Sequence, residues 1–209
     1  WSSAVCSSDL DRVLVAVGRR PNASVPGLDR TKVQVDARGF ILHDEQMRTA
    51  EPSIFVIGDV AGEPMLAHKA SHEARVAVEA IAGMPVTFEP AAIPAVVFTD
   101  PEVAWCGLTE TRARDRGIEV RVTSFPWIAS GRSVTMGRLD GLTKLIVEPD
   151  TERILGIGIV GKGAGELMGE AVTAIEMGMR VEDLHLAIHA HPTLAETLME
   201  AASLYYGQS

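Results

Sequence analysis

The sequence predicts an α/β segment followed by an α+β domain, in which an antiparallel sheet carries helices on one side. A hydrophobic fraction of 46% is enough for packed cores and excludes a disordered chain. Apolar runs at residues 12–17 and 54–57 are typical of strands buried on both faces, and a helical pattern follows the second run. Beyond a proline-rich stretch at residues 86–94, short apolar runs are grouped and joined by turns, which favours an antiparallel sheet.

The α/β segment is predicted to begin with a strand over residues 12–17, which ends at Gly18 in turn-forming sequence. Alternating segments at residues 33–35 and 40–42 predict a small hairpin. The run at residues 54–57 predicts a further buried strand that stops before a loop.

A helix is predicted from Pro64 to Ala82, because proline is favoured at the first helical position. Gly83 and Pro85 follow it and end the helical pattern. The apolar positions that recur at helical spacing are Leu66, Ala70, Ala74, Ala77 and Ile81. We therefore expect this face to pack against the rest of the segment.

The α+β domain is predicted to contain strands at residues 95–99, 103–106, 119–125, 142–147 and 154–160, with helices at residues 109–116, 165–177 and 193–206. Residues 1–10 show neither a period nor a hydrophobic face. The predicted organisation is a leader at residues 1–10, the α/β segment at residues 11–90 and the α+β domain at residues 91–209.

Charge and composition exclude several classes of function. Lysine and arginine number 19 against 28 aspartate and glutamate, for a formal charge of −9, and the longest basic run is Arg19-Arg20, so nucleic acid is not an expected partner. We expect no membrane segment and no secretory leader, because every apolar stretch is far shorter than a bilayer span. Cys6 and Cys106 form no paired motif, so we expect neither a disulfide framework nor a thiolate metal site, and a cytoplasmic protein.

A glycine motif, Gly156-Ile-Gly158-Ile-Val-Gly161, matches the dinucleotide fingerprint, with Glu176 where the ribose-binding acid would be. The fingerprint requires a strand that ends at the first glycine, but here the glycines lie inside the predicted strand. Interior glycines more often mark close packing against another backbone, and we favour that interpretation over a small dinucleotide-binding module.

Two histidines, His68 and His72, have the spacing of metal ligands on one helix face, but no third ligand is near them in sequence. No metal site is predicted there.

The segment from His191 to Glu196 has two interpretations. Pro192 holds His191 in an extended conformation, and Thr193-Leu-Ala-Glu196 has the pattern of a capping box with Thr193 as N-cap. Alternatively, Glu196 accepts a hydrogen bond from one ring nitrogen of His191 and leaves the other nitrogen as a base. One carboxylate would have to serve both partners, and the residues alone leave both interpretations open.

Asp59 is equally ambiguous. It either closes the strand as a turn residue or offers a carboxylate to ligand hydroxyls, with Gly58 allowing close approach and the helix start at residues 65–68 presenting amides beside it. Ligands of open α/β sheets bind beyond the carboxyl ends of the strands, which favours the second interpretation.

Several motifs together resemble the pyridine nucleotide–disulfide oxidoreductases, and among them the dihydrolipoamide (dihydrolipoyl) dehydrogenase family of flavoenzymes. They are Val17-Gly-Arg-Arg-Pro-Asn22, Ile54-Phe-Val-Ile-Gly-Asp59, Met65-Leu-Ala-His-Lys-Ala70, Thr99-Asp-Pro-Glu-Val-Ala-Trp105, Phe125-Pro-Trp127 and Ile188-His-Ala-His-Pro-Thr-Leu-Ala-Glu196. The likeness extends from about residue 12 to residue 206. His-Ala-His-Pro-Thr-Leu and the Pro-Trp segment favour the lipoamide enzymes over sister enzymes such as glutathione reductase.

The resemblance implies FAD and NAD as cofactors. His191 matches the family's catalytic histidine, which takes a proton from the dihydrolipoyl thiol, and Glu196 matches the carboxylate that orients it. Gly58 and Asp59 match the contact with the flavin's ribityl chain, and Gly18 falls at the contact with the nicotinamide nucleotide. The residues that match the helix start lining FAD are Met65, Leu66, Ala67 and His68.

The resemblance also implies that residues 11–90 are a remnant of the FAD- and NAD-binding domains and that residues 91–209 are the dimerisation domain of a homodimer serving lipoyl-bearing subunits of 2-oxoacid dehydrogenase complexes. The family's FAD fingerprint and paired redox cysteines have no counterpart in this sequence. We therefore expect a C-terminal part of the enzyme that is inactive alone. The alternatives are another disulfide reductase, such as glutathione reductase, and a non-catalytic module for dimerisation or complex binding.

Overall fold

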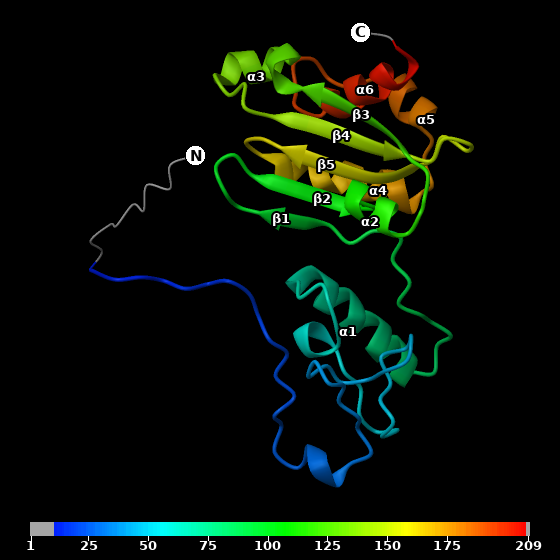
Figure 1. Cartoon of the computed structure of the whole chain (residues 1–209). Coiled ribbons are helices and arrows are strands. Elements are labelled where there is room, and N and C mark those ends of the chain that lie inside the picture. The colour runs from blue at the N-terminus through cyan, green and yellow to red at the C-terminus, as the bar shows by residue number, and fades with distance from the viewer. Residues whose placement is uncertain (1–10, 208–209) are drawn as a thin grey trace. The chain divides into compact units, whose positions relative to one another are not determined.

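The chain divides into two compact units, one ending at Phe88 and the other starting at Glu89 (Figure 1). The computed structural model describes residues 11–207. The predicted leader and Cys6 lie outside the described residues. The division falls inside the proline-rich stretch at residues 86–94. Each unit is described by itself below.

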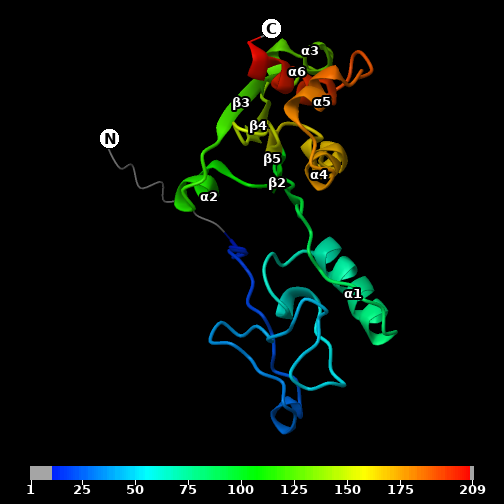
Figure 2. The ribbon, with the colours of Figure 1, turned by 90° about the vertical axis from the view of Figure 1, so that its right-hand side faces the viewer.

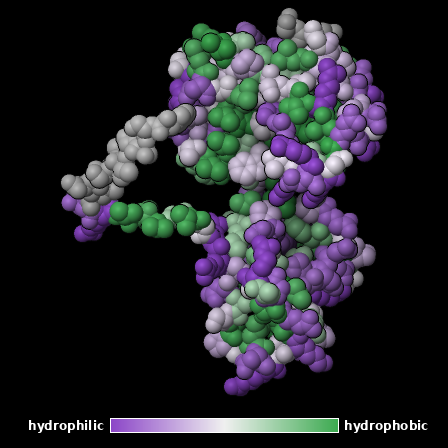
Figure 3. Space-filling model, in the orientation of Figure 1, coloured by the Kyte–Doolittle hydropathy of each residue, from purple (hydrophilic) through white to green (hydrophobic). Residues whose placement is uncertain are grey.

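The strand predicted over residues 12–17 is wrong, because this segment is extended but belongs to no sheet. Val13, Leu14, Val15 and Val17 are between 71% and 94% exposed, and the apolar run is visible as green spheres in Figure 3. A strand requires a neighbour for its backbone hydrogen bonds, and within residues 11–207 no strand or bridge pairs with this run. The run is apolar as predicted, but it has no partner strand within residues 11–207.

The rest of the first unit is held by turns and single bridges. The predicted hairpin at residues 33–42 is present as a bridge between Val35 and Ile41. The predicted strand at residues 54–57 is reduced to a bridge between Arg48 and Phe55. A small core forms around Ile41, Val56 and Ala61, and two short 3-10 helices complete the unit, η1 (Leu28–Arg30) and η2 (Gly58–Val60).

Helix α1 (Ala67–Ile81) confirms the predicted helix but begins after Pro64 rather than at it. Its buried face differs from the predicted alanine-rich one, since Ile81 is 64% exposed. The buried positions are Lys69, Glu73, Ala77 and Ala80. The helix therefore buries a charged pair, and such burial is tolerated when the charges pair with each other and are hydrogen-bonded.

The second unit contains one antiparallel sheet with the strand order β1-β2-β5-β4-β3. The strands are β1 (Ala95–Val97), β2 (Val103–Gly107), β3 (Arg121–Pro126), β4 (Leu142–Val147) and β5 (Ile154–Val160). Each predicted strand of this unit is confirmed to within a few residues. Every neighbouring pair runs antiparallel, as the turn-rich sequence between the runs predicts.

Helices cover mainly one face of this sheet. In Figure 2, α4 (Met168–Glu176), α5 (Val181–Leu186) and α6 (Glu196–Ser203) lie on one side, and α2 (Glu110–Asp115) lies on the other. The α+β architecture is thus confirmed. Two helices were not predicted, α5 and α3 (Gly131–Met136), because each spans only 6 residues and shows little periodicity. No helix in the described part of the chain is long and apolar enough to cross a membrane.

Gly156 and Gly158 of the glycine motif lie within β5, as the packing interpretation predicts, and Gly161 follows directly after the strand. A Cβ atom at Gly156 would lie 1.9 Å from the carbonyl oxygen of Leu108, so this glycine permits close backbone approach. Gly158 has open space beside it, so the packing explanation does not extend to that position. Glu176 accepts a hydrogen bond from the backbone N–H of Ala92, at 3.1 Å, which gives its carboxylate a structural partner.

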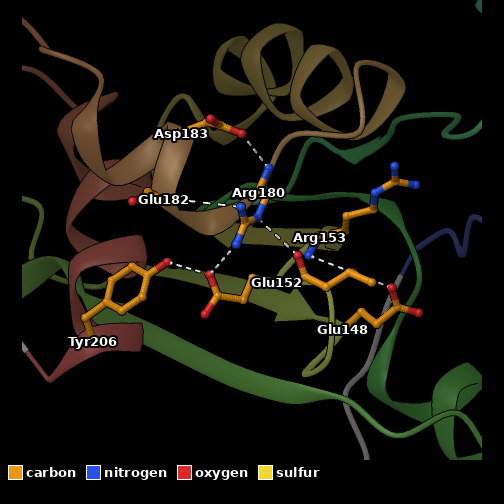
Figure 4. Close-up of polar contacts among 8 residues, drawn as sticks. Glu148, Glu152, Arg153, Arg180, Glu182, Asp183 and Tyr206 are labelled. Carbon is orange, nitrogen blue, oxygen red and sulfur yellow. Dashed lines mark hydrogen bonds and ion pairs between the residues drawn. The ribbon is translucent and has the colours of Figure 1, made fainter.

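Arg180 joins the β4–β5 hairpin to the elements that follow it (Figure 4). Its guanidinium donates to the carbonyl of Thr151 and to Glu152 Oε2, and the Tyr206 hydroxyl donates to the same Glu152 oxygen at 3.0 Å. Its backbone N–H donates to Asp183 in the first turn of α5. These contacts fix the start of α5, and α5 leads directly into the loop that carries His191.

Candidate active site

His191 and Glu196 lie together at the loop that connects α5 to α6. The ring nitrogen Nδ1 of His191 is 2.9 Å from Glu196 Oε1, and the backbone N–H of Thr193 donates to Glu196 Oε2 at 2.7 Å. Each carboxylate oxygen therefore serves a different partner. The contact that each interpretation assigns to Glu196 is therefore present, because the carboxylate has two acceptor atoms and the loop brings one partner to each.

The capping box itself is only half formed. Glu196 reaches back to the N–H of Thr193 as expected, but the Thr193 hydroxyl donates to the carbonyl of Ala190 at 2.7 Å instead of capping the helix. Helix α6 begins at Glu196. The predicted N-cap role of Thr193 is wrong, because its hydroxyl binds the carbonyl of Ala190, the residue before His191.

The exposure of the pair suits proton transfer to a bound molecule. The His191 side chain is 75% exposed and that of Glu196 only 18%. A carboxylate accepts but cannot donate, so His191 presents the protonated Nδ1 to Glu196 and leaves Nε2 as a free acceptor in its neutral form. The geometry gives an accessible base oriented by a shielded anion.

Glu196 is held in its ionised form. Burial by itself would raise its pKa, but hydrogen bonds from the Thr193 N–H and the His191 ring, with the nearby charges of His191 and His189, hold the pKa below its ordinary value. An ionised Glu196 is what the orientation of the His191 ring requires.

A buried chain of hydrogen bonds supports the start of α6. Trp127 Nε1 donates to Thr143 Oγ1 at 2.9 Å, Thr143 and Thr197 are 2.8 Å apart, and Thr197 donates to the carbonyl of Leu194 at 2.7 Å. Because an indole only donates and Thr197 already donates to Leu194, the Thr143 hydroxyl donates to Thr197. Sequence reasoning missed this support; its only signal is a threonine in the apolar run of β4.

A second histidine of the same loop, His189, is also engaged by a carboxylate. Its Nε2 lies 2.7 Å from Glu170 Oε1 of α4 and its Nδ1 lies 2.9 Å from the carbonyl oxygen of Ala187. The side chain is 8% exposed. The only signal for His189 in the sequence is the repeated histidine of His189-Ala-His191, which by itself predicts no role.

In the first unit, Asp59 and Met65 are brought together by an unforeseen residue, Arg19. Its Nη1 donates to the Met65 carbonyl at 2.6 Å and lies 3.8 Å from Asp59 Oδ2. Asp59 lies in η2 with a half-exposed side chain, and Gly58 before it has a φ of 80°, a conformation that favours glycine. Gly18, next to Arg19, lies in the exposed segment without sheet partners.

Two side chains of α1 hold the loop that carries Asp59. Glu73 Oε2 accepts from the Gly58 N–H at 2.7 Å, and Lys69 Nζ donates to the Gly62 carbonyl at 3.1 Å. Lys69 and Glu73 form an ion pair of 2.5 Å with side chains 5% and 2% exposed. This buried pair, also unforeseen, sets the backbone on both sides of Asp59.

The residues of this unit fit a flavin nucleotide by their chemistry. Asp59 offers a carboxylate that accepts from hydroxyls, and the N-terminus of α1 follows it with no side-chain cap at Leu66 and no acidic residue in its first turn. Ala67 and His68 open that helix, and both are exposed. A helix N-terminus without its own anion favours an acceptor-rich ligand.

No group of three or more metal-binding side chains occurs within residues 11–207. His68 and His72, four residues apart on α1, are not part of such a group in the described residues. Cys106 lies buried in β2, and burial raises the pKa of its thiol to about 12, so it is a packed and unreactive side chain.

Two family models match the chain. The "Pyridine nucleotide-disulphide oxidoreductase, dimerisation domain" matches residues 93–202, and "Pyridine nucleotide-disulphide oxidoreductase" matches residues 6–74. The first match alone covers more than half of the chain.

Two curated relatives carry the name dihydrolipoyl dehydrogenase. The chain is 51% identical to the dihydrolipoyl dehydrogenase of Vibrio cholerae, over 94% of this chain and 42% of the relative. It is 49% identical to that of Thermus scotoductus, over 96% of this chain and 43% of the relative. The chain thus spans about two fifths of the length of these relatives.

Solved structures agree in fold. The HOCl-induced flavoprotein disulfide reductase RclA from Escherichia coli superimposes with a TM-score of 0.82 at 26% identity, over 90% of this chain and 44% of that chain. LpdA from Mycobacterium tuberculosis gives the same TM-score and identity, over 89% of this chain and 41% of that chain.

Proposed function

Because the chain belongs to the pyridine nucleotide-disulphide oxidoreductase family, we propose that it supplies the acid–base site of a dihydrolipoyl dehydrogenase. The proposed reaction oxidises protein-bound dihydrolipoamide to lipoamide and reduces NAD+, through FAD and a redox disulfide. The observation that carries the proposal is the exposed His191 ring, hydrogen-bonded at 2.9 Å to a shielded Glu196.

In this reaction His191 accepts a thiol proton at Nε2 while its Nδ1 stays hydrogen-bonded to Glu196. The carboxylate stabilises the imidazolium that forms and keeps the ring in one orientation, as in other acid–base pairs of this kind. The Thr193 N–H keeps Glu196 in place throughout, because it binds the other oxygen. After lipoamide has formed, the exposed His191 ring releases the proton from Nε2 to solvent.

The first unit is proposed to hold part of the flavin site. Asp59 would bind ribityl hydroxyls, and Met65, Leu66, Ala67 and His68 at the start of α1 would line the bound nucleotide. Gly58 would let it approach the backbone, and Gly18 would lie at the nicotinamide nucleotide contact. Bound FAD would supply the two-electron chemistry, and this chain would supply position and charge.

The proposed partners are a second copy of the protein and the lipoyl-bearing subunits of 2-oxoacid dehydrogenase complexes, in the cytoplasm. The match to a dimerisation domain over residues 93–202 supports the homodimer. A 75% exposed base at the surface of this unit is suited to a redox centre carried by another chain. The 209 residues alone are proposed to be inactive, since they contain no paired cysteines.

A second candidate is a different flavoprotein disulfide reductase, which the likeness to RclA favours. The test is a chimera in which this chain replaces the matching segment of the Vibrio cholerae dihydrolipoyl dehydrogenase, to which it is 51% identical. We expect the chimera to bind FAD and to oxidise dihydrolipoamide with NAD+. A chimera that binds FAD but reduces glutathione disulfide instead would favour the second candidate. A flavin-loaded chimera without either activity would favour a non-catalytic module.

A further inference from the structure

His189 has only acceptors around its ring nitrogens. The Ala187 carbonyl, 2.9 Å from Nδ1, can accept but never donate, so Nδ1 carries a proton. Glu170 Oε1 is 2.7 Å from Nε2. The Glu170 side chain is 36% exposed and keeps contact with solvent. A carboxylate is again an acceptor, so this contact calls for a proton on Nε2 as well.

From this geometry we propose that His189 is an imidazolium at neutral pH, held by Glu170 and the Ala187 carbonyl, that positions the His191–Glu196 pair. The proposal rests on the proposed function for the role of that pair. His189 is a positioning residue in this account, because its ring is buried and engaged on both nitrogens and cannot exchange a proton with substrate.

The positioning acts through the loop. His189 attaches the loop to α4 through Glu170, and Glu196 attaches it to α6 through the Thr193 N–H. His191 lies between these two anchors and is 75% exposed, whereas His189 is 8% exposed. The loop thus contains two histidine–carboxylate pairs with different tasks, one buried and fixed and one open to exchange.

The charge of His189 also acts on Glu196. The titratable groups that act on the His189 ring are Glu170 of α4 and Glu196 of α6. Burial by itself would lower the pKa of His189, but the Glu170 hydrogen bond, the Ala187 carbonyl and the two carboxylate charges outweigh it and raise the pKa. In turn the imidazolium contributes to the lowered pKa of Glu196.

The test is ¹⁵N NMR of the histidine rings in the 209-residue chain at pH 7.5, about one unit above the ordinary histidine midpoint. We expect both ring nitrogens of His189 to be protonated. In Glu170→Gln the titration midpoint of His189 should fall by about one pH unit or more, because the anion is lost. Glu166→Gln is the matched control, since Glu166 is an exposed carboxylate just before the same helix, and it should leave His189 protonated.

A His189 ring with one unprotonated nitrogen at pH 7.5 in the unaltered chain would overturn the proposal. So would a Glu170→Gln variant with an unchanged His189 titration. In the chimera, Glu170→Gln should lower kcat for dihydrolipoamide and shift its pH profile, with FAD still bound. Loss of all lipoamide turnover in the unaltered chimera, together with a doubly protonated His189, would reject the proposed function and leave the charge state of His189 supported.

Discussion

Glu196 divides its two oxygens between a side chain and a backbone amide, and this division explains how a capping residue can also orient a base. The sequence predicts the contact with His191, because Pro192 and the spacing to Glu196 bring the residues within reach. It does not predict which oxygen serves which partner. That depends on the side-chain conformation of Glu196 and on the Thr193 hydroxyl, which closes on Ala190 rather than on the helix.

The lowered pKa of Glu196 predicts how stability depends on pH. A carboxyl group whose pKa is lower in the folded state stabilises that state above its unfolded pKa, and the contribution is lost as the pH falls through the folded value. We expect Glu196→Gln to lower the free energy of unfolding at pH 7. The deficit should shrink below about pH 4.3, the ordinary glutamate value.

Urea unfolding of both chains from pH 3 to pH 8 measures this deficit. Glu200→Gln is a control on the same helix, because Glu200 takes no part in the hydrogen bonds of the loop. A deficit for Glu196→Gln that does not change with pH would show that packing, and not charge, is what the substitution removes.

Helix α1 illustrates what periodicity cannot predict. Its alanines recur at helical spacing and suggest an apolar face, whereas the helix buries Lys69 and Glu73 one position away from that face. Nothing in the pattern distinguishes a buried lysine from an exposed one. The buried pair is explained by the backbone of residues 58–62, because Glu73 accepts a hydrogen bond from the Gly58 N–H and Lys69 donates one to the Gly62 carbonyl.

The buried pair makes a strong prediction for stability. Lys69→Met removes the cation and leaves Glu73 charged and 1% exposed, which should cost about 3–5 kcal/mol in the free energy of unfolding. Adding Glu73→Gln should recover much of the loss, because the amide is neutral and its oxygen still accepts from the Gly58 N–H. Denaturant unfolding of the single and double variants measures both effects.

An exposed pair on the same helix provides the control. Arg75 and Glu79 are also four residues apart, and the Arg75 side chain is 76% exposed, so Arg75→Met should change stability by less than about 1 kcal/mol. If Lys69→Met and Arg75→Met had equal effects, the buried pair would not have the role assigned to it here.

At the scale of the molecule, the second unit follows from its sequence and the first does so only partly. Three of the four strand pairings join strands that follow one another in the chain, such as β4 and β5, whose turn contains Pro149-Asp150, so pattern and fold largely agree. The pairing of β2 with β5 is the exception, since other elements lie between these strands in sequence. The run at residues 12–17 is different. Its composition is typical of a buried strand, but no strand within residues 11–207 pairs with it. A hydrophobic pattern shows that a segment is suited to burial, but it does not show which part of the protein would cover it.

The roles of the candidate site residues could be inferred only from family likeness. Composition and spacing give His191 and Glu196 as a possible pair and Asp59 as a possible ligand-binding residue. Arg19 pairs with Asp59, and Glu170 and Thr143 contact His189 and Thr197 beside the His191–Glu196 pair. These contacts join segments far apart in sequence, and no local pattern marks them.

The central claim, that His191 is the proton-accepting residue of a dihydrolipoyl dehydrogenase, is tested most directly by His191→Gln in the Vibrio cholerae chimera. The measurement is kcat for dihydrolipoamide oxidation, with bound FAD determined by absorbance. His185→Gln is the matched control, because His185 lies in α5 and bonds Ser203 at the end of α6, apart from the His191–Glu196 pair. We predict a fall in kcat of about 100-fold or more for His191→Gln, full FAD content and near-unchanged turnover for His185→Gln. Undiminished turnover in the FAD-loaded His191→Gln chimera would contradict the account.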